Sequence, residues 1–367
     1  MDQLSILHDA FRKDPNPNKR NFLKSTVKLS CIDDIPPNKN HSYLPWSGDP
    51  EFLSIVRQRF SLPRDRPVIQ TNSNTSALYL LLRTLPQTSV YTDTPTWSNY
   101  PYMASQTRKT FHSFANKANN CNILSELEDI RDSIIILQPI LQNPLGYLMD
   151  PHLLTSIACI CERNNNAILF DVCYFGYAEF RREKRLLQHI LTLHGDTHIC
   201  FSFSKNMGLF GERIGFLATQ QHLMHSLNCL IRTSYSCPSR NGAYIVRNIL
   251  EHKYIEWLKE LDTNRYQCIE RKYAIIQGIS SLLTKEQHEM LAAQQGWFIT
   301  LTFLSPSQIH DLLELGIYTY NGRITLSGIE RKEDIELLIS SLVTVMSPSK
   351  DQTIEHSENI IPPIKIV

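Results

Sequence analysis

The chain has 367 residues, of which 42% are hydrophobic and 20% are charged, a composition typical of a folded globular protein with two or three domains. Its 37 basic and 36 acidic residues nearly cancel, which argues against a nucleic-acid partner. No apolar stretch approaches the roughly 20 residues that span a bilayer, and the first residues lack the pattern of a secretory signal. Nine dispersed cysteines without a CxxC pair favour free thiols over disulfides or a metal site. We therefore expect a cytoplasmic protein without a membrane or metal partner.

Short apolar runs alternate with amphipathic helical stretches through most of the chain, which predicts βαβ units and a mainly parallel sheet. Three helices carry a clear start signal, a capping residue followed by proline, at Asp49-Pro50, Asp150-Pro151 and Ser305-Pro306. The runs that we predict as strands are residues 67–71, 89–92, 133–139, 167–171, 198–204 and 213–218.

The pattern changes after about residue 264, where long helices alternate with the short β-like runs WFITLTFL and GRITLSG. This change indicates a smaller α+β domain that the N-terminal segment joins. We predict a large domain over residues 37–265, a small domain formed by residues 1–36 and 266–346, and a polar C-terminal tail over residues 347–367.

Distinctive polar residues follow several of the predicted strands. Ligands of open α/β sheets bind at the carboxyl ends of the strands, so these residues predict a single site. They are Ser73, Asn74 and Thr75 after the first strand, Asn143 after the third, Asp171 and Tyr174 after the fourth, and Ser202, Ser204, Lys205 and Arg213 around the fifth.

The chemistry of these side chains points to one kind of ligand. Hydroxyl groups at a helix N-terminus, together with Arg213, suit a phosphate. A buried Asp171 requires a cation, and a lysine held away from water has a lowered pKa and acts as a nucleophile. A phosphate, a ring cation and a carbonyl that reacts with amines together describe pyridoxal 5′-phosphate. Each residue alone is more often a helix cap or a solvated charge, so their common place at strand ends carries the prediction.

The stretch SFSKNMGLFGERIG, residues 202–215, resembles the lysine motif of class I aminotransferases, in the aspartate and aromatic amino acid branch of fold-type I pyridoxal-phosphate enzymes. Further segments resemble that family in the same order along the chain. The resemblance implies an α/β fold with a mainly parallel seven-stranded-type sheet flanked by helices, a smaller α+β domain, and a homodimer with shared active sites. The further segments are FRKDPNPNK, YLPWSGDPEFL, QTNSNTSAL, TPTWSNY, QNPLG, FDVCYFGYA, IRTSYSCP and NGRITLSG.

The resemblance also implies a role for individual residues of the cofactor site. Lys205 would hold the cofactor covalently and then move a proton, and Asp171 would pair with the ring nitrogen. Tyr174 and Asn143 would bind the phenolic oxygen, and Trp97 would stack on the ring. The phosphate would be bound by Ser73, Asn74, Thr75, Ser202 and Arg213, and by Tyr43 of a neighbouring subunit.

For the substrate, the resemblance implies that Arg323 binds the α-carboxylate and that Arg232 of the neighbouring subunit binds a distal carboxylate. Asn143 and Trp97 would also face the substrate, and Ser25 would stand where the family has a glycine-rich segment. Further departures from the family pattern concern the choice of substrate more than the type of reaction. They are Asn74 and Ser76 in the phosphate turn, Gln138 and Gln142 in place of histidines, and Leu145 in place of threonine.

The sequence therefore predicts a pyridoxal-phosphate-dependent aminotransferase that works by a ping-pong mechanism. Its substrates would be an aspartate-like or aromatic amino acid and a 2-oxo acid such as 2-oxoglutarate. The alternatives are another fold-type I enzyme with lyase or Cβ chemistry, and a cofactor-binding regulatory protein without turnover. A nucleotide-binding dehydrogenase is less well supported, because GLFGERIG is not a GxGxxG motif.

Overall fold

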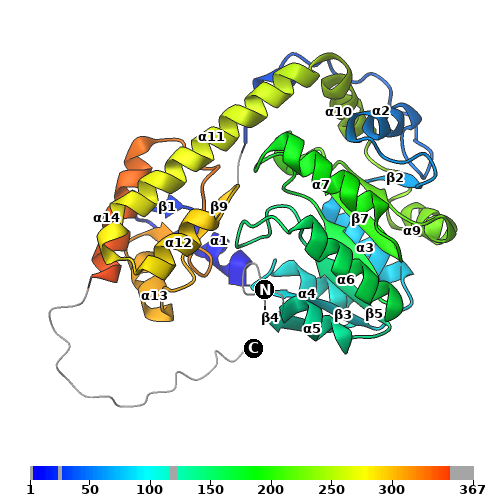
Figure 1. Ribbon diagram of the computed structural model, residues 1–367. Coiled ribbons are helices and arrows are strands. Elements are labelled where there is room, and N and C mark those ends of the chain that lie inside the picture. Colours follow the sequence, from blue (N-terminus) through cyan, green and yellow to red (C-terminus); the bar gives the residue numbers. More distant parts are fainter. Residues whose placement is uncertain (1–2, 24–26, 116–121, 348–367) are drawn as a thin grey trace.

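The computed structural model describes residues 3–23, 27–115 and 122–347, and its centre is one seven-stranded sheet (Figure 1). The strand order is β2-β8-β7-β6-β5-β3-β4, and β8 alone runs antiparallel to its neighbours. All six runs that were predicted as strands form strands of this sheet, and the seventh is the edge strand β4. The strands are β2 (Val68–Thr71), β3 (Ser89–Thr94), β4 (Thr110–Ala115), β5 (Ser133–Leu137), β6 (Ala167–Asp171), β7 (Thr197–Ser202) and β8 (Gly215–Ala218).

The central strands are buried on both faces because helices cover the sheet on both sides. Alternate residues of β5 point to opposite layers: Ile134 and Ile136 belong to one hydrophobic cluster, Ile135 and Leu137 to the other. The first cluster includes side chains of α3 (Asn74–Thr84), α4 (Asn99–Gln106) and α9 (Met224–Tyr235). The second includes side chains of α2 (Pro50–Phe60), α5 (Asn122–Glu128), α6 (Pro151–Arg163), α7 (Phe180–Thr192) and α10 (Arg240–His252).

The predicted helix starts are confirmed by their capping bonds. Asp49 accepts hydrogen bonds from the backbone N–H groups of Glu51 and Phe52 at the start of α2. Asp150 caps α6 in the same way, and Ser305 forms a capping box at the start of α13 (Pro306–Glu314). Each of these caps satisfies N–H groups that the first helical turn leaves unpaired.

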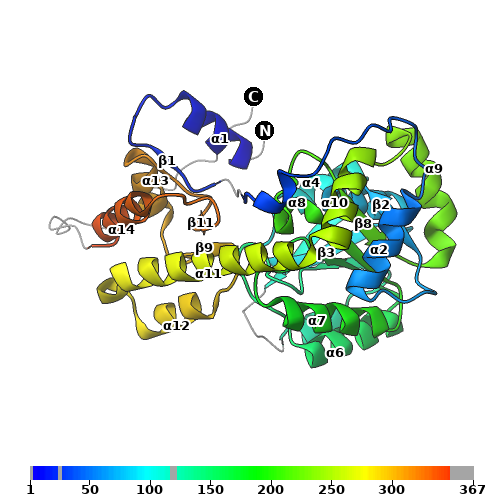
Figure 2. The same ribbon diagram turned by 90° about the horizontal axis from the view of Figure 1, so that it is seen from above.

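A smaller unit with its own hydrophobic cluster packs beside the sheet (Figures 1 and 2). The 25-residue helix α11 (Tyr254–Gly278) joins the two units, since Trp257 belongs to the large cluster and Ile275 to the small one. One continuous helix thus runs through the predicted boundary at residue 265. The small unit contains α12 (Lys285–Ala293), α13 (Pro306–Glu314), α14 (Lys332–Met346), β1 (Arg20–Asn21), β9 (Phe298–Thr300), β10 (Ile317–Tyr318) and β11 (Arg323–Thr325).

The N-terminal helix α1 (Gln3–Lys13) lies with the small unit, as Figure 2 shows. Phe11 of α1 contacts the ring of Tyr318, with 5.1 Å between the ring centroids. Short 3₁₀ helices occur at Ser30–Ile32, Gln221–Leu223 and Ser280–Leu282.

Three predictions about the rest of the chain have different outcomes. The cysteines within the described residues are free thiols, as expected. None of the helices in the described part of the chain combines the length and apolar character needed to cross a bilayer. The predicted polar tail lies outside the described residues from position 348 onward.

Candidate active site

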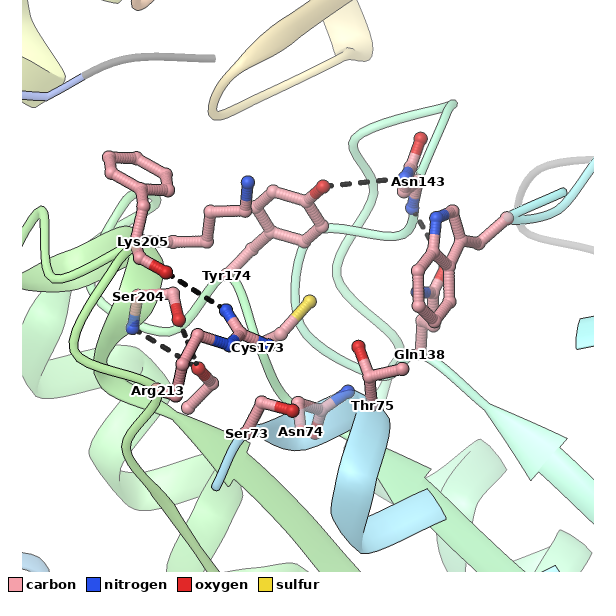
Figure 3. A pocket seen from close by; sticks show the side chains of 13 residues that line it. Ser73, Asn74, Thr75, Gln138, Asn143, Cys173, Tyr174, Ser204, Lys205 and Arg213 are labelled. Atoms are coloured by element: carbon pink, nitrogen blue, oxygen red, sulfur yellow. Dashed lines mark hydrogen bonds between the residues drawn. The ribbon is translucent and has the colours of Figure 1, made fainter. Parts of the chain in front are cut away.

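The polar residues that follow the strands meet in one cavity at the carboxyl edge of the sheet (Figure 3). The cavity has a volume of about 190 Å³, and a second hollow of about 380 Å³ adjoins it toward the small unit. Both hollows are lined by Trp97, Asn143, Tyr174, Lys205 and Phe210. Most of the residues predicted at the strand ends therefore line one cavity.

Lys205 lies in the short helix α8 (Phe203–Asn206), directly after β7. Its Nζ atom is 4.9 Å from the ring centroid of Phe210 and 5.3 Å from that of Trp297. The pKa of the amine is lowered to about 8, mainly by burial; Cys173 opposes this shift, and the charges of Arg323 and Arg213 add to it. About a tenth of this amine is therefore neutral and nucleophilic at pH 7, far more than for an ordinary lysine.

Two glycines after Lys205 allow the backbone to pass close to other segments. Gly208 has a φ of +65°, and a Cβ atom there would lie 2.6 Å from the carbonyl oxygen of Val27. A Cβ atom on Gly215 would lie 2.2 Å from the carbonyl oxygen of Phe201. Glycine is required at both positions for steric reasons.

The N-terminus of α3 lies at the bottom of the cavity in Figure 3, and Ser202 and Arg213 line the same cavity. The Ser73 hydroxyl oxygen accepts a 3.0 Å bond from the backbone N–H of Ser76, and Asn74 and Thr75 line the cavity. The buried Oδ1 atom of Asn74 has no hydrogen-bond partner among the described residues. Hydroxyl groups, a helix N-terminus and a guanidinium on one side of a cavity suit an anion.

Asp171 ends β6 behind the cavity wall and is 1% exposed. Tyr100 donates a 2.7 Å hydrogen bond to its Oδ2 atom, the Gln138 amide approaches the same oxygen at 3.4 Å, and the backbone N–H of Cys173 donates to Oδ1 at 3.1 Å. The donors that the described residues bring to Asp171 in these bonds are all neutral. A buried carboxylate with only neutral donors is costly, so the site suits a cationic ligand.

Arg323 enters the site from β11 and is 7% exposed. Its Nη1 atom donates a 2.9 Å bond to the Asn143 side-chain oxygen, and the Asn143 amide donates a 3.3 Å bond to the Tyr174 hydroxyl. The Nε atom of Arg323 has no hydrogen-bond partner in the described part of the chain, and burial lowers the pKa of the group. A buried guanidinium with unused donors suits a carboxylate ligand.

Two residues of the predicted site lie away from the cavity, and a third is outside the described residues. Tyr43 is 82% exposed, and the Arg232 guanidinium lies 5.1 Å from the ring centroid of Trp46. Neither residue lines the cavity of its own chain, as expected of residues that act in a neighbouring subunit. Ser25 lies outside the described residues.

Several residues of the cavity were not predicted. Cys173 stands next to the predicted residue Tyr174, so its position in the sequence could have identified it. Phe210 lies inside the lysine motif, and Leu4 and His8 reach the adjoining hollow from α1. The two α1 residues are one helical turn apart, but nothing in the local sequence indicates that this helix faces the site.

The two substituted glutamines have partners that fit their amide groups. The Gln138 side-chain oxygen accepts a 2.9 Å bond from the backbone N–H of Asn143. Gln142 donates a 2.6 Å bond to the carbonyl oxygen of Pro95 and accepts one from the backbone N–H of Leu145. Both amides therefore fix the loop that carries Asn143.

The sequence matches the family model described as aminotransferase class I and II over residues 31–341. The chain belongs to the class I and II aminotransferases. Within this pyridoxal-phosphate-dependent family, it is a class I member of the aspartate and aromatic branch.

Among its relatives, this aminotransferase is 27% identical to aspartate aminotransferase 1 of Medicago sativa, with 88% of each chain covered. It is 26% identical to the cytoplasmic aspartate aminotransferase of Schizosaccharomyces pombe, covering 89% of this chain and 92% of that protein.

Solved structures of aminotransferases share the fold. The aromatic-amino-acid aminotransferase of Burkholderia pseudomallei, covalently bound to pyridoxal phosphate, superimposes with a TM-score of 0.84 at 21% identity, covering 95% of this chain and 97% of that one. The broad specificity aminotransferase of Leishmania mexicana gives a TM-score of 0.84 at 22% identity, covering 94% and 96%.

The residues of this aminotransferase fit its cofactor. Asp171 offers a carboxylate without a cationic hydrogen-bond partner among the described residues, and the N-terminus of α3 offers anion-binding groups. Lys205 offers a buried amine with a lowered pKa in the same cavity.

Proposed function

We propose that this aminotransferase moves an amino group between an aspartate-like or aromatic amino acid and a 2-oxo acid such as 2-oxoglutarate, by a ping-pong mechanism. The observation that carries the proposal is three groups in one region: a lysine amine with a pKa of about 8 that lines both hollows, a buried carboxylate behind the cavity wall, and a buried guanidinium at the adjoining hollow. Each of them lacks a partner of opposite charge in its hydrogen bonds within the described chain.

Pyridoxal 5′-phosphate supplies an aldehyde that bonds to amines and a ring that accepts the electrons released when a bond at Cα breaks. Lys205 would hold the cofactor through its Nζ atom. When that atom is free, it would remove the proton from the substrate Cα. Its lowered pKa suits this role, because an amine that is partly neutral near pH 7 can both accept and return a proton.

The residues around the ring position have complementary tasks. Asp171 holds the ring nitrogen in its protonated form by charge and hydrogen bonding. Asn143 and Tyr174, which already bond each other, face the phenolic oxygen. Trp97 covers one face of the ring.

Binding of the phosphate falls to the N-terminus of α3 and to the residues after β7. Ser73, Asn74 and Thr75 offer hydroxyl, amide and backbone N–H groups, and Ser202 and Arg213 complete the set. Tyr43 of a second copy of the chain adds a hydroxyl. These contacts orient the cofactor and take no part in proton transfer.

Selection of the substrate begins at Arg323, whose planar donors bind an α-carboxylate in a bidentate manner. Arg232 of a second copy favours a distal carboxylate, while the rings of Trp97, Phe210 and Phe298 give an aromatic side chain a surface to contact. Ser25 stays a predicted neighbour of the substrate. The cytoplasmic location stays a prediction too, since the curated relatives include cytoplasmic, mitochondrial and chloroplastic enzymes.

The test is amino-group exchange by the purified protein with added cofactor. Aspartate, tyrosine and phenylalanine are each supplied with 2-oxoglutarate, and we expect one glutamate for each amino acid consumed. Lys205→Ala should lower turnover by about 10³-fold or more, because it removes the acid–base group. Lys259→Ala, on the exposed side of α11, is the matched control and should keep full activity.

The products distinguish the proposal from its alternatives. Release of ammonia or pyruvate without glutamate would indicate a lyase. A protein that binds the cofactor but exchanges no amino group with any of the three donors would contradict an aminotransferase of this specificity.

A further inference from the structure

Tyr100 contacts two residues of the proposed cofactor site, Asp171 and Trp97, and has no role of its own in the proposed mechanism. It lies in α4, three positions after Trp97, and its side chain is fully buried. Its hydroxyl donates the 2.7 Å hydrogen bond to Oδ2 of Asp171. Its ring meets the Trp97 ring edge-on, with 5.3 Å between the centroids and 84° between the planes. One side chain therefore contacts both the carboxylate proposed for the ring nitrogen and the indole proposed for the ring face.

The hydroxyl makes the shortest of the hydrogen bonds to Asp171 given above, since the other two measure 3.1 and 3.4 Å. Tyr100 stays protonated, because burial and the neighbouring carboxylate raise its pKa well above its ordinary value. A neutral donor of this kind fixes the direction of a carboxylate and leaves its negative charge for another partner.

We infer that Tyr100 is a positioning residue that directs the Asp171 carboxylate at the ring nitrogen of the cofactor. The inference rests on the proposed pairing of Asp171 with that nitrogen. Without the hydroxyl, the carboxylate loses its shortest hydrogen bond and is free to turn away from the ring position. Ligand binding then has to turn the carboxylate back, so affinity falls for a ligand that carries the ring nitrogen.

The experiment measures binding without catalysis. The full-length chain freed of cofactor is titrated with pyridoxine 5′-phosphate, whose alcohol cannot bond covalently to Lys205, and with its 1-deaza counterpart, in which CH replaces the ring nitrogen. Tyr100→Phe keeps the ring that contacts Trp97 and removes only the hydroxyl. We expect this substitution to weaken the binding of pyridoxine 5′-phosphate by about 10-fold or more. It should weaken the binding of the deaza compound by less than about twofold.

Two controls separate positioning from general stability. Tyr102→Phe, on the same helix and 48% exposed, should change neither affinity. In a protein that already carries Asp171→Asn, Tyr100→Phe should lower the affinity for pyridoxine 5′-phosphate by less than about a further twofold, because the hydroxyl acts through the carboxylate. Thermal unfolding of each variant checks that the fold is kept.

The remaining outcomes overturn the inference in distinguishable ways. If Tyr100→Phe lowers the affinity for both ligands equally, Tyr100 has only a structural role. If it lowers the affinity for neither ligand, Tyr100 does not position Asp171. Both results leave the proposed function intact. A wild-type protein that binds the two ligands equally would overturn the pairing of Asp171 with the ring nitrogen, and the inference with it.

Discussion

At the scale of single residues, the property of Lys205 that decides its chemistry is its protonation state. Burial is the main reason why the pKa of this amine is about 8 instead of its ordinary 10.5, and two nearby arginines contribute. A protonated amine has no lone pair, so Lys205 reacts with an aldehyde only in its neutral form. Protonation below about pH 8 therefore slows the reaction, and deprotonation above it speeds the reaction.

We expect the rate at which the cofactor-free protein captures pyridoxal 5′-phosphate to rise with pH, with a midpoint near 8, and to level off about one unit higher. The measurement is the growth of cofactor absorbance after rapid mixing, at a series of pH values. Free N-acetyl-lysine is the control, and its rate should still be rising at that pH. A protein profile that follows the free amine would contradict a lowered pKa.

At the scale of elements, β8 approaches β7 so closely that one methyl group does not fit. A Cβ atom on Gly215 would meet the Phe201 carbonyl oxygen at 2.2 Å, whereas one on Gly211 would have no atom within 4 Å. We expect Gly215→Ala to lower the free energy of unfolding by about 1–3 kcal/mol, or to prevent folding, since backbone must move. Gly211→Ala should stay within about 0.5 kcal/mol of wild type. Urea unfolding of the two variants gives the comparison, and equal stabilities would refute the steric argument.

The strands themselves show how far the local sequence carries a prediction. β5 and β6 are buried along their whole length, so each is a continuous apolar run that is visible in the sequence. The edge strand β4 has the sequence TFHSFA, with polar residues at exposed positions. Because these residues interrupt the apolar run, the strand was not predicted. The hydrogen bond from Tyr100 to Asp171 joins residues 71 positions apart. It depends on the strand order, which no local pattern encodes.

At the scale of the whole molecule, the site takes residues from both units. Lys205 comes from the sheet side, Arg323 comes from β11, and His8 comes from α1, which lies with the small unit. Helix α11 packs against both units and so links the two walls of the adjoining hollow. The family resemblance predicted the role of Arg323, because the motif that contains this residue is contiguous in sequence. The place of α1 follows only from how the chain folds back.

The proposed site needs a second copy of the chain, because Tyr43 and Arg232 lie away from the cavity of their own chain. If Arg232 serves a neighbouring site, Lys205→Ala and Arg232→Ala chains should complement each other. A mixed dimer would contain one site with both defects and one site with neither. We expect random mixing to restore activity toward aspartate to about a quarter of wild type, because half of the dimers are mixed and each has one intact site.

The measurement is exchange activity after the two variants are unfolded and refolded together. A mixture of Lys205→Ala with Asp171→Asn, whose residues belong to the same site, should restore nothing. Equal activity in the two mixtures would contradict a site shared between chains.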